Sequence, residues 1–245
     1  MKQLNRLKYK NWTLISAPDV GVEDAKELFH TVQDSKFETC EVLKDNQRSE
    51  VKRIKVSDND FVLKIPKEKN SRFWIRFLTL FRKGEAQKNL KSMMILKNIG
   101  VKTTNPILAA EKRSFGMVVD SWLLYQFVDG RSCLNQPETY KKVIDTLESI
   151  HQYGFIHGDP QIRNFIQKDS DIYVIDANPQ KAGMTGFDFG YEWAYLRKSD
   201  KGIQPILDDL IDSKWYKFAI WYDKVDRKLA RLRKRVKKVF GVKSS

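Results

Sequence analysis

A chain of 245 residues, 41% of them hydrophobic, is long enough to bury one domain built as two lobes but short for two independent domains. Its two cysteines, Cys40 and Cys133, exclude a disulfide framework, and the N-terminal sequence lacks the apolar run of a secretory signal, so a reducing cytosol is expected. No apolar stretch is long enough for a membrane-spanning helix, so any membrane contact is expected to be peripheral. Lys and Arg (45) exceed Asp and Glu (31), and the resulting net charge of +14 favours an anionic partner such as nucleic acid, anionic lipid or a phosphorylated sugar.

The first predicted elements are strands. Between residues 40 and 65, β-branched and polar residues alternate around Asn and Asp clusters, a pattern typical of two or three antiparallel strands. The last of these strands, FVLKI, carries Lys64 near its centre. Apolar residues at helical spacing then predict a helix over residues 84–100, with Glu85 at its start and Gly100 as its C-terminal cap.

The segment between these elements, residues 71–83 (SRFWIRFLTLFRK), interleaves aromatic rings with arginines. Two interpretations are open. The segment forms an interfacial helix whose rings lie among lipid headgroups, or it forms a buried helix that caps the first lobe.

Residues 101–128 predict a hairpin, with a turn at residues 113–116 and the apolar strand MVVDSWLLYQFV. The breaker Asp129-Gly130 follows, and we take it as the lobe boundary. The expected organisation is therefore an N-lobe over residues 1–128, a C-lobe with the catalytic loop over residues 129–226, and a basic amphipathic tail over residues 227–245.

In the second lobe, Pro137 opens a predicted helix that Gly154 closes. The loop IHGDPQIRNF follows it, and a short strand, IYVI, then ends at Asp176. Further helices are expected over residues 203–212 and 214–240. Residues 227–243 hold nine basic residues and no acidic one, which favours contact with an anionic surface.

The spacing of Asp159 and Asn164 matches the catalytic loop of protein kinases, H-R-D followed by four residues and Asn, with Gly158 in place of the arginine. An aspartate there can accept the proton of an acceptor hydroxyl, while the asparagine oxygen helps coordinate Mg²⁺. One loop would thus position the nucleophile and the metal. In this type of loop His157 is expected to be structural.

Two aspartates compete for the role of the second metal ligand. A literal D-F-G occurs at residues 188–190, but it lies 29 residues after Asp159. Asp176 lies 17 residues after Asp159 and directly follows a strand, as the metal aspartate of a kinase does. We therefore interpret Asp176 as the ligand and Asp188 as a decoy.

The segments HGDPQIRNF, IYVIDANP, FVLKIP and EAQKNLKSMMIL resemble the lipopolysaccharide core heptose kinase family, over approximately residues 40–200. That family is an atypical branch of the protein-kinase-like fold related to the aminoglycoside phosphotransferases. The resemblance implies a bilobal α+β fold, with an antiparallel sheet and one helix in the N-lobe and a small, mainly helical C-lobe. It also implies ATP-dependent phosphorylation, with Mg²⁺, of a heptose in the lipopolysaccharide inner core, by a cytoplasmic protein peripheral to the inner membrane.

Carried over by position, the resemblance gives each site residue a role. Lys64 would contact the α- and β-phosphates of ATP and pair with Glu85, and Asp159 would be the base. Asn164 and Asp176 would bind Mg²⁺, and a hinge that includes Gln126 and Val128 would offer backbone groups to adenine. Two departures stand out: the phosphate-covering segment KDNQRSEVKRI contains no glycine, and no A-P-E-like segment follows Asp176, which argues against a protein substrate.

The expected partners are the lipid-linked lipopolysaccharide core oligosaccharide and the anionic surface of the inner membrane, with no nucleic acid and an undetermined oligomeric state. Two alternatives are open. An aminoglycoside-type phosphotransferase would need an acidic acceptor pocket, which a chain at +14 does not obviously supply. A non-catalytic nucleotide- or nucleic-acid-binding module would act through its basic tail.

Overall fold

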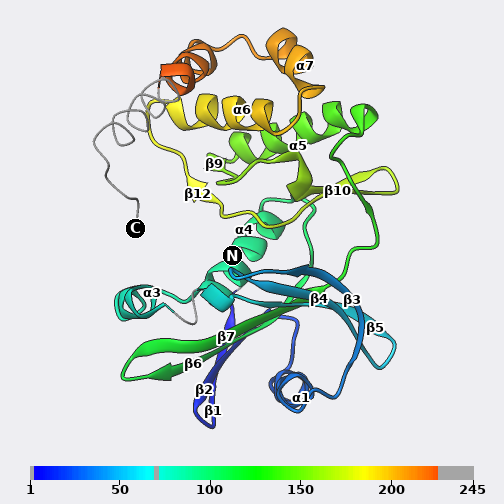
Figure 1. Cartoon of the computed structure of the whole chain (residues 1–245), viewed down its shortest axis with the longest axis vertical. Coiled ribbons are helices and arrows are strands. Elements are labelled where there is room, and N and C mark those ends of the chain that lie inside the picture. The colour runs from blue at the N-terminus through cyan, green and yellow to red at the C-terminus, as the bar shows by residue number, and fades with distance from the viewer. Residues whose placement is uncertain (1–2, 69–71, 226–245) are drawn as a thin grey trace, which may run out of the picture. The chain divides into compact units, whose positions relative to one another are not determined.

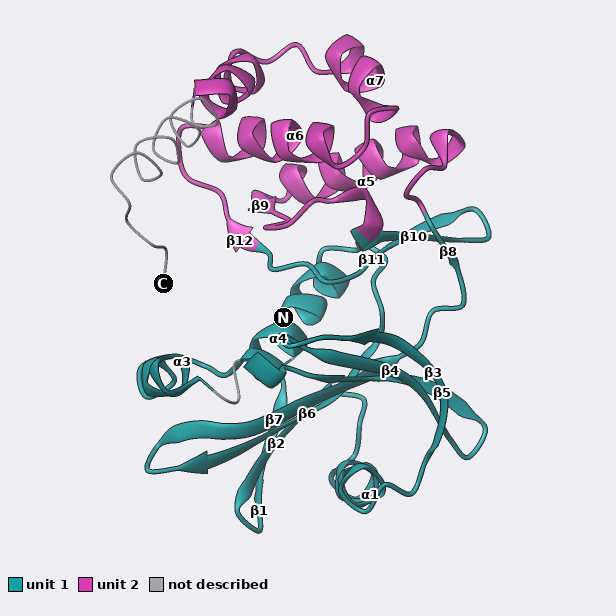
Figure 2. Cartoon of the chain, in the orientation of Figure 1, with its two compact units in different colours: residues 1–132, 164–179 teal, residues 133–163, 180–245 magenta. Residues whose placement is uncertain are grey.

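The computed structural model describes residues 3–68 and 72–225 (Figure 1). They form two compact units, coloured separately in Figure 2. Unit 1 comprises the chain up to Ser132 together with Asn164–Pro179, and unit 2 comprises Cys133–Arg163 together with the chain from Gln180 onward. The mixed α+β class expected from the sequence is confirmed.

Unit 1 contains a seven-stranded sheet in the order β1-β2-β6-β7-β5-β4-β3, in which every neighbouring pair is antiparallel. The strands are β1 (Asn5–Tyr9), β2 (Trp12–Ser16), β3 (Glu38–Asp45), β4 (Glu50–Val56), β5 (Asn59–Ile65), β6 (Pro106–Ser114) and β7 (Met117–Gln126). The strands predicted within residues 40–65 and the hairpin predicted within residues 101–128 are confirmed. The structure adds β1 and β2, and β2 pairs with β6.

The helices of unit 1 include α1 (Val22–Gln33), α3 (Phe73–Leu78) and α4 (Glu85–Asn98). The predicted helix over residues 84–100 is α4, and Gly100 follows it with a φ of 78°, a conformation that favours glycine. α3 lies within residues 71–83, for which both interpretations expected a helix, and the structure adds α1. Among the described residues, no helix has the length and apolar character needed to cross a bilayer.

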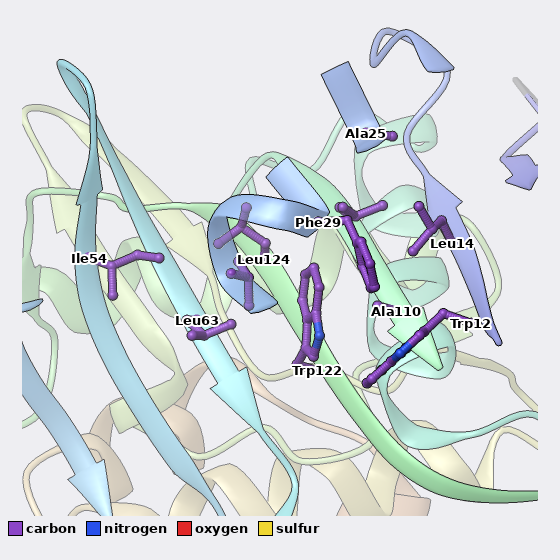
Figure 3. Packing of buried hydrophobic residues seen from close by; sticks show 11 residues of the cluster. Trp12, Leu14, Ala25, Phe29, Ile54, Leu63, Ala110, Trp122 and Leu124 are labelled. Carbon is purple, nitrogen blue, oxygen red and sulfur yellow. The ribbon is translucent and has the colours of Figure 1, made fainter. Parts of the chain in front are cut away.

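Both faces of this sheet are covered, because neighbouring residues of a strand point to opposite faces. On one face, Leu124 belongs to a cluster in which Phe29 of α1 stacks on Trp122 with ring centroids 6.1 Å apart (Figure 3). On the other face, Leu123 packs in a cluster with Leu90 of α4. Burial on both faces explains why the sequence of β7 reads as a nearly continuous apolar run rather than an alternating one.

A smaller sheet in unit 1 has the order β11-β10-β8, from β8 (Arg131–Ser132), β10 (Phe165–Lys168) and β11 (Asp171–Val174). The Val174 amide donates to the carbonyl of Lys102 at 2.9 Å, and the Thr103 hydroxyl donates to the Val174 carbonyl at 2.7 Å. These bonds place residues 164–179 in unit 1, whereas the sequence assigned all of residues 129–226 to the second lobe. The first break in the chain also falls after Ser132 rather than after residue 128.

Unit 2 is mainly helical, as expected. Its elements include η1 (Pro137–Thr139), α5 (Tyr140–Gln152), β9 (Phe155–Ile156), β12 (Gln180–Lys181), α6 (Phe187–Ser199) and α7 (Ile203–Leu210). Residues 214–225 are also helical, and the short helix η2 (Ile162–Asn164) crosses into unit 1. The helix predicted over residues 137–154 is confirmed as η1 followed by α5. The predicted tail at residues 227–245 lies outside the described residues.

Candidate functional site

Two residues that are 112 positions apart in the sequence meet in unit 1. Lys64 of β5 donates from Nζ to Asp176 Oδ1 at 2.6 Å. Burial opposes the charge of Lys64, but Asp176, Tyr125 and, more weakly, Glu85 outweigh it, so the pKa of Lys64 is raised above its ordinary value. Lys64 is therefore a cation at neutral pH, and it contacts a carboxylate that is 52% exposed and accessible to a ligand.

The backbone brings Asn164 next to the Asp176 segment. The amide of Ile175 donates to the Asn164 carbonyl at 2.8 Å, directly before Asp176. Asp176 then has a φ of 53°, in the left-handed region that aspartate tolerates better than most residues. The β11 strand therefore ends in a turn that fixes Asp176 close to the chain at Asn164.

An asparagine oxygen and a carboxylate, together with phosphate oxygens and water, are the donors that Mg²⁺ uses in nucleotide sites. Asn164 and Asp176 fit that donor set. Among the described residues, no group of three or more His, Cys, Asp or Glu side chains could hold a metal. A protein-only metal cage is therefore not found there, whereas a site completed by phosphates needs only these two side chains.

The remaining residues predicted for the nucleotide lie in the same unit. Glu85 is the first residue of α4, and its charge helps to raise the pKa of Lys64. At the predicted hinge, the Gln126 amide donates to the carbonyl of Asn105 at 2.9 Å, so any contact of Gln126 with adenine would use another group. Val128 is partly buried. Tyr125 directly precedes Gln126, and its pKa is raised to about 12, mainly by burial.

In unit 2, the side chain of Asp159 is held in place by a neighbour in its own loop. Gln161 donates from Nε2 to Asp159 Oδ1 at 2.7 Å and to the Tyr195 hydroxyl at 3.2 Å. Burial raises the pKa of Tyr195, and the negative charge of Asp159 raises it further. The sequence interpretation missed Gln161 and Tyr195. Gln161 belongs to no part of the kinase motif, and no local pattern links Tyr195 of α6 to a loop residue 34 positions before it.

A buried glutamate holds the backbone of the same loop. Glu192 of α6 is 3% exposed and accepts hydrogen bonds from the amides of His157 (2.7 Å) and Gly158 (2.6 Å). It also contacts His151 Nε2 at 3.0 Å. Gly158 has a φ of 87°, which explains why glycine stands at this position. His157 is fully buried and accepts from the Asp159 amide through Nδ1 at 3.3 Å, a contact in keeping with its expected structural role.

The D-F-G sequence lies elsewhere in unit 2. Asp188 is in the first turn of α6, where its Oδ2 accepts from the Gly183 amide at 2.7 Å. That contact fixes the chain at the start of the helix. The aspartate that contacts Lys64 is Asp176, and its role as the metal ligand stays a prediction.

We expect Glu192→Ala to lower the free energy of unfolding by about 3 kcal/mol, because the buried His157 amide and the partly buried Gly158 amide lose their acceptor. Glu192→Gln should cost less, since one carboxamide oxygen still accepts. Denaturant titration of the full chain measures both changes. Glu148→Ala on the exposed face of α5 is the control and should change the value by less than about 0.5 kcal/mol. Equal midpoints for the two alanine variants would show that Glu192 does not hold the loop.

Comparison with known proteins adds a family to this geometry. The family model described as "Lipopolysaccharide core biosynthesis protein (WaaY)" matches residues 3–186, well over half of the chain. A curated relative, the lipopolysaccharide core heptose(II) kinase WaaY of Escherichia coli (strain K12), is 26% identical over 141 residues. That alignment covers 53% of this chain and only 60% of the relative.

One solved structure supports the fold. WaaP, solved in complex with acyl carrier protein, superimposes with a TM-score of 0.52 at 14% identity, and the match covers 88% of this chain and 96% of WaaP. A thermostable mutant of the aminoglycoside phosphotransferase APH(4)-Ia, in its apo form, gives a TM-score of 0.48 at 12% identity, covering 83% of this chain and 84% of that one. The likeness to WaaP confirms the expected kinase-like α+β fold.

Proposed function

Because the chain belongs to the WaaY family of lipopolysaccharide core biosynthesis proteins, we propose that it is an ATP-dependent kinase that phosphorylates a heptose of the lipopolysaccharide inner core. The heptose kinase named among its relatives supports the reaction class. The observation that carries the proposal is the Lys64–Asp176 ion pair. It joins the mostly buried ammonium group of Lys64 on β5 to the accessible carboxylate of Asp176, whose neighbour Ile175 is hydrogen-bonded to the backbone of Asn164.

In the proposed reaction, Asp159 accepts the proton of the sugar hydroxyl as that oxygen attacks the γ-phosphorus of ATP, while the bond from the γ-phosphorus to the β–γ bridging oxygen breaks and ADP leaves with that oxygen. Gln161, bridged to Tyr195, keeps one carboxylate oxygen in place, and Glu192 fixes the loop backbone. The protein therefore orients its base before the substrate arrives, which lowers the entropic cost of the reaction.

On the nucleotide side, Lys64 exchanges Asp176 for the α- and β-phosphates, and its raised pKa keeps it charged for that contact. Asn164 and Asp176 would hold Mg²⁺ through their side-chain oxygens. The bound metal would neutralise the charge that develops on the phosphoryl group. In this proposal, Glu85 supports the charge of Lys64, and Gln126 and Val128 lie beside the adenine.

The proposed acceptor is the lipid-linked core oligosaccharide, so we place the protein at the cytoplasmic face of the inner membrane as a peripheral protein. The net charge of +14 complements that anionic surface. WaaP was solved with an acyl carrier protein, and a carrier protein of this kind is a second candidate partner.

Mass spectrometry of the lipopolysaccharide core, from cells with and without the gene, tests the function. We expect the core to lose one phosphate when the gene is deleted and to regain it when the gene is supplied on a plasmid. The empty plasmid is the control. An unchanged core phosphate content after deletion would overturn the assignment to core phosphorylation.

A further inference from the structure

A group of apolar side chains, which we call the aromatic patch, is exposed on unit 1. It comprises Phe73, Trp74, Phe77, Leu80, Phe81 and Phe115. Trp74 is 66% exposed, Phe81 83% and Phe115 95%. Ring contacts connect the patch: Trp74 stacks on Phe77 at 5.7 Å, and Phe77 meets Phe81 edge-on at 6.1 Å. None of the residues of α3 is buried, so the structure does not support the alternative that this segment is a buried cap.

The patch is attached to unit 1 by polar contacts rather than by its rings. The buried Thr79 accepts from the Val118 amide of β7 through Oγ1 at 2.8 Å. Its carbonyl accepts from Arg113 Nη1 at 3.0 Å, and the same Arg113 nitrogen donates to the Gly116 carbonyl at 2.7 Å. Leu80, two residues after α3, lies against Gly116, which brings the β6–β7 turn with Phe115 to the segment that follows the helix. The rings are thus presented on a fixed support while their faces remain in water, which is unfavourable without a partner.

The patch belongs to a cation-rich segment. Residues 72–88 contain five Lys or Arg side chains and one acid, Glu85. Three of the cations, Arg82, Lys83 and Lys88, line a cavity of about 370 Å³ with Glu85 and with Ile75 and Thr79, which neighbour the patch residues in the sequence. A partner that fits both features must be apolar within and anionic at its surface.

We propose that the aromatic patch inserts into the headgroup region of an anionic bilayer, with lipid phosphates at Arg82, Lys83 and Lys88. This inference rests on the proposed function, which places the acceptor sugar on a membrane. The interleaving of rings and cations favours lipid, because long cationic side chains reach phosphates while neighbouring rings enter the acyl boundary. The rings on a short exposed helix would need to enter the bilayer only to headgroup depth.

The test for the rings is sedimentation of the full chain with vesicles of phosphatidylglycerol and phosphatidylcholine. The triple variant Phe73→Ser, Trp74→Ser and Phe81→Ser should bind about tenfold more weakly than the parent. The matched control is Val22→Ser, Val42→Ser and Leu43→Ser, three exposed apolar residues of the same unit outside the patch, and it should bind as the parent does. All six positions are exposed, and a thermal melt verifies that both variants fold.

A second pair of variants tests the cations. Arg82→Gln with Lys83→Gln should weaken vesicle binding by about 30-fold, since each of the two cations near an anionic surface contributes about fivefold. Lys44→Gln with Lys55→Gln removes two exposed cations from β3 and β4 and is the matched control. Binding of the parent should fall in vesicles of phosphatidylcholine alone and at high salt.

The outcomes separate this inference from the proposed function. Asp159→Ala should bind vesicles like the parent, so a failure of catalysis does not affect the result. The inference is overturned if the patch variants sediment with vesicles as the parent does, which would assign membrane contact to another surface. It is also overturned if the parent does not sediment with vesicles but binds an acyl carrier protein, and the patch variants lose that binding, because the partner is then a protein.

Discussion

Replacing Asp159 by asparagine is expected to lower the turnover number for phosphoryl transfer by about 10³-fold, within the range that a positioned general base contributes. The asparagine oxygen can still accept the hydrogen bond from Gln161, so the loop should keep its conformation. What is lost is the ability to take the proton of the sugar hydroxyl. A steady-state assay of ADP release with core oligosaccharide as acceptor measures the effect, and KM for ATP should change little.

The control for this substitution is Asp169→Asn, an exposed aspartate five residues beyond Asn164 whose φ of 55° asparagine also tolerates. It removes one negative charge ten positions after Asp159 in the sequence without touching the base. Turnover should stay within about twofold of the parent, as is usual for a surface substitution. Comparable losses in the two variants would mean that the local charge, rather than a base at Asp159, supports the reaction.

The elements that the sequence predicted well are those in which local pattern and tertiary packing agree. The helix predicted over residues 84–100 appears as Glu85–Asn98 because its apolar spacing matches the face that packs on the sheet. The strand FVLKI appears as part of β5 for a similar reason. In both cases the residues that define the period are also the ones that are buried.

The N-terminal elements received no prediction. β1 is mostly exposed, and β2 is short and buried, so neither shows the alternating pattern of a half-buried strand. The return of residues 164–179 to unit 1 was also missed, since it depends on hydrogen bonds from Val174 and Thr103 across more than 70 positions. Contacts of that range leave no trace in local periodicity.

For the candidate site, motif spacing found Asp159, Asn164, Asp176 and Lys64, and the structure brings Lys64 to Asp176. Spacing did not find Glu192, which accepts hydrogen bonds from the loop backbone, or Gln161 and Tyr195, which make the hydrogen bonds that hold the Asp159 side chain. The sequence predicted no helix over α6, and the available signal there was Glu192 directly before the apolar residues Trp193 and Ala194. A carboxylate within an apolar helical face is costly unless it is hydrogen-bonded, and that cost could have marked Glu192.

We expect Lys64→Met and Asp176→Asn each to lower kcat/KM for ATP by about 10²-fold or more, because each removes a group that offsets phosphate charge. The two should differ in their metal dependence. Asp176→Asn should raise the Mg²⁺ concentration for half-maximal rate, whereas Lys64→Met should leave it nearly unchanged. The double variant should be little worse than either single one, since the two residues act on the same phosphates. Initial rates across a Mg²⁺ titration measure all three variants.

The D-F-G sequence of this chain provides the control for that prediction. Asp188→Asn keeps a side-chain oxygen that can accept from the Gly183 amide, so it should fold and turn over at close to the parent rate. Because the pKa of Lys64 is raised, its charge is complete below its ordinary pKa of 10.5 and is lost only as the pH rises through the higher folded value. The difference in activity between Asp176→Asn and Asp188→Asn should therefore persist at every pH in the neutral range. If Asp188→Asn were inactive and Asp176→Asn active, the metal site would have to be assigned to α6, and the Lys64–Asp176 pair would be a structural ion pair.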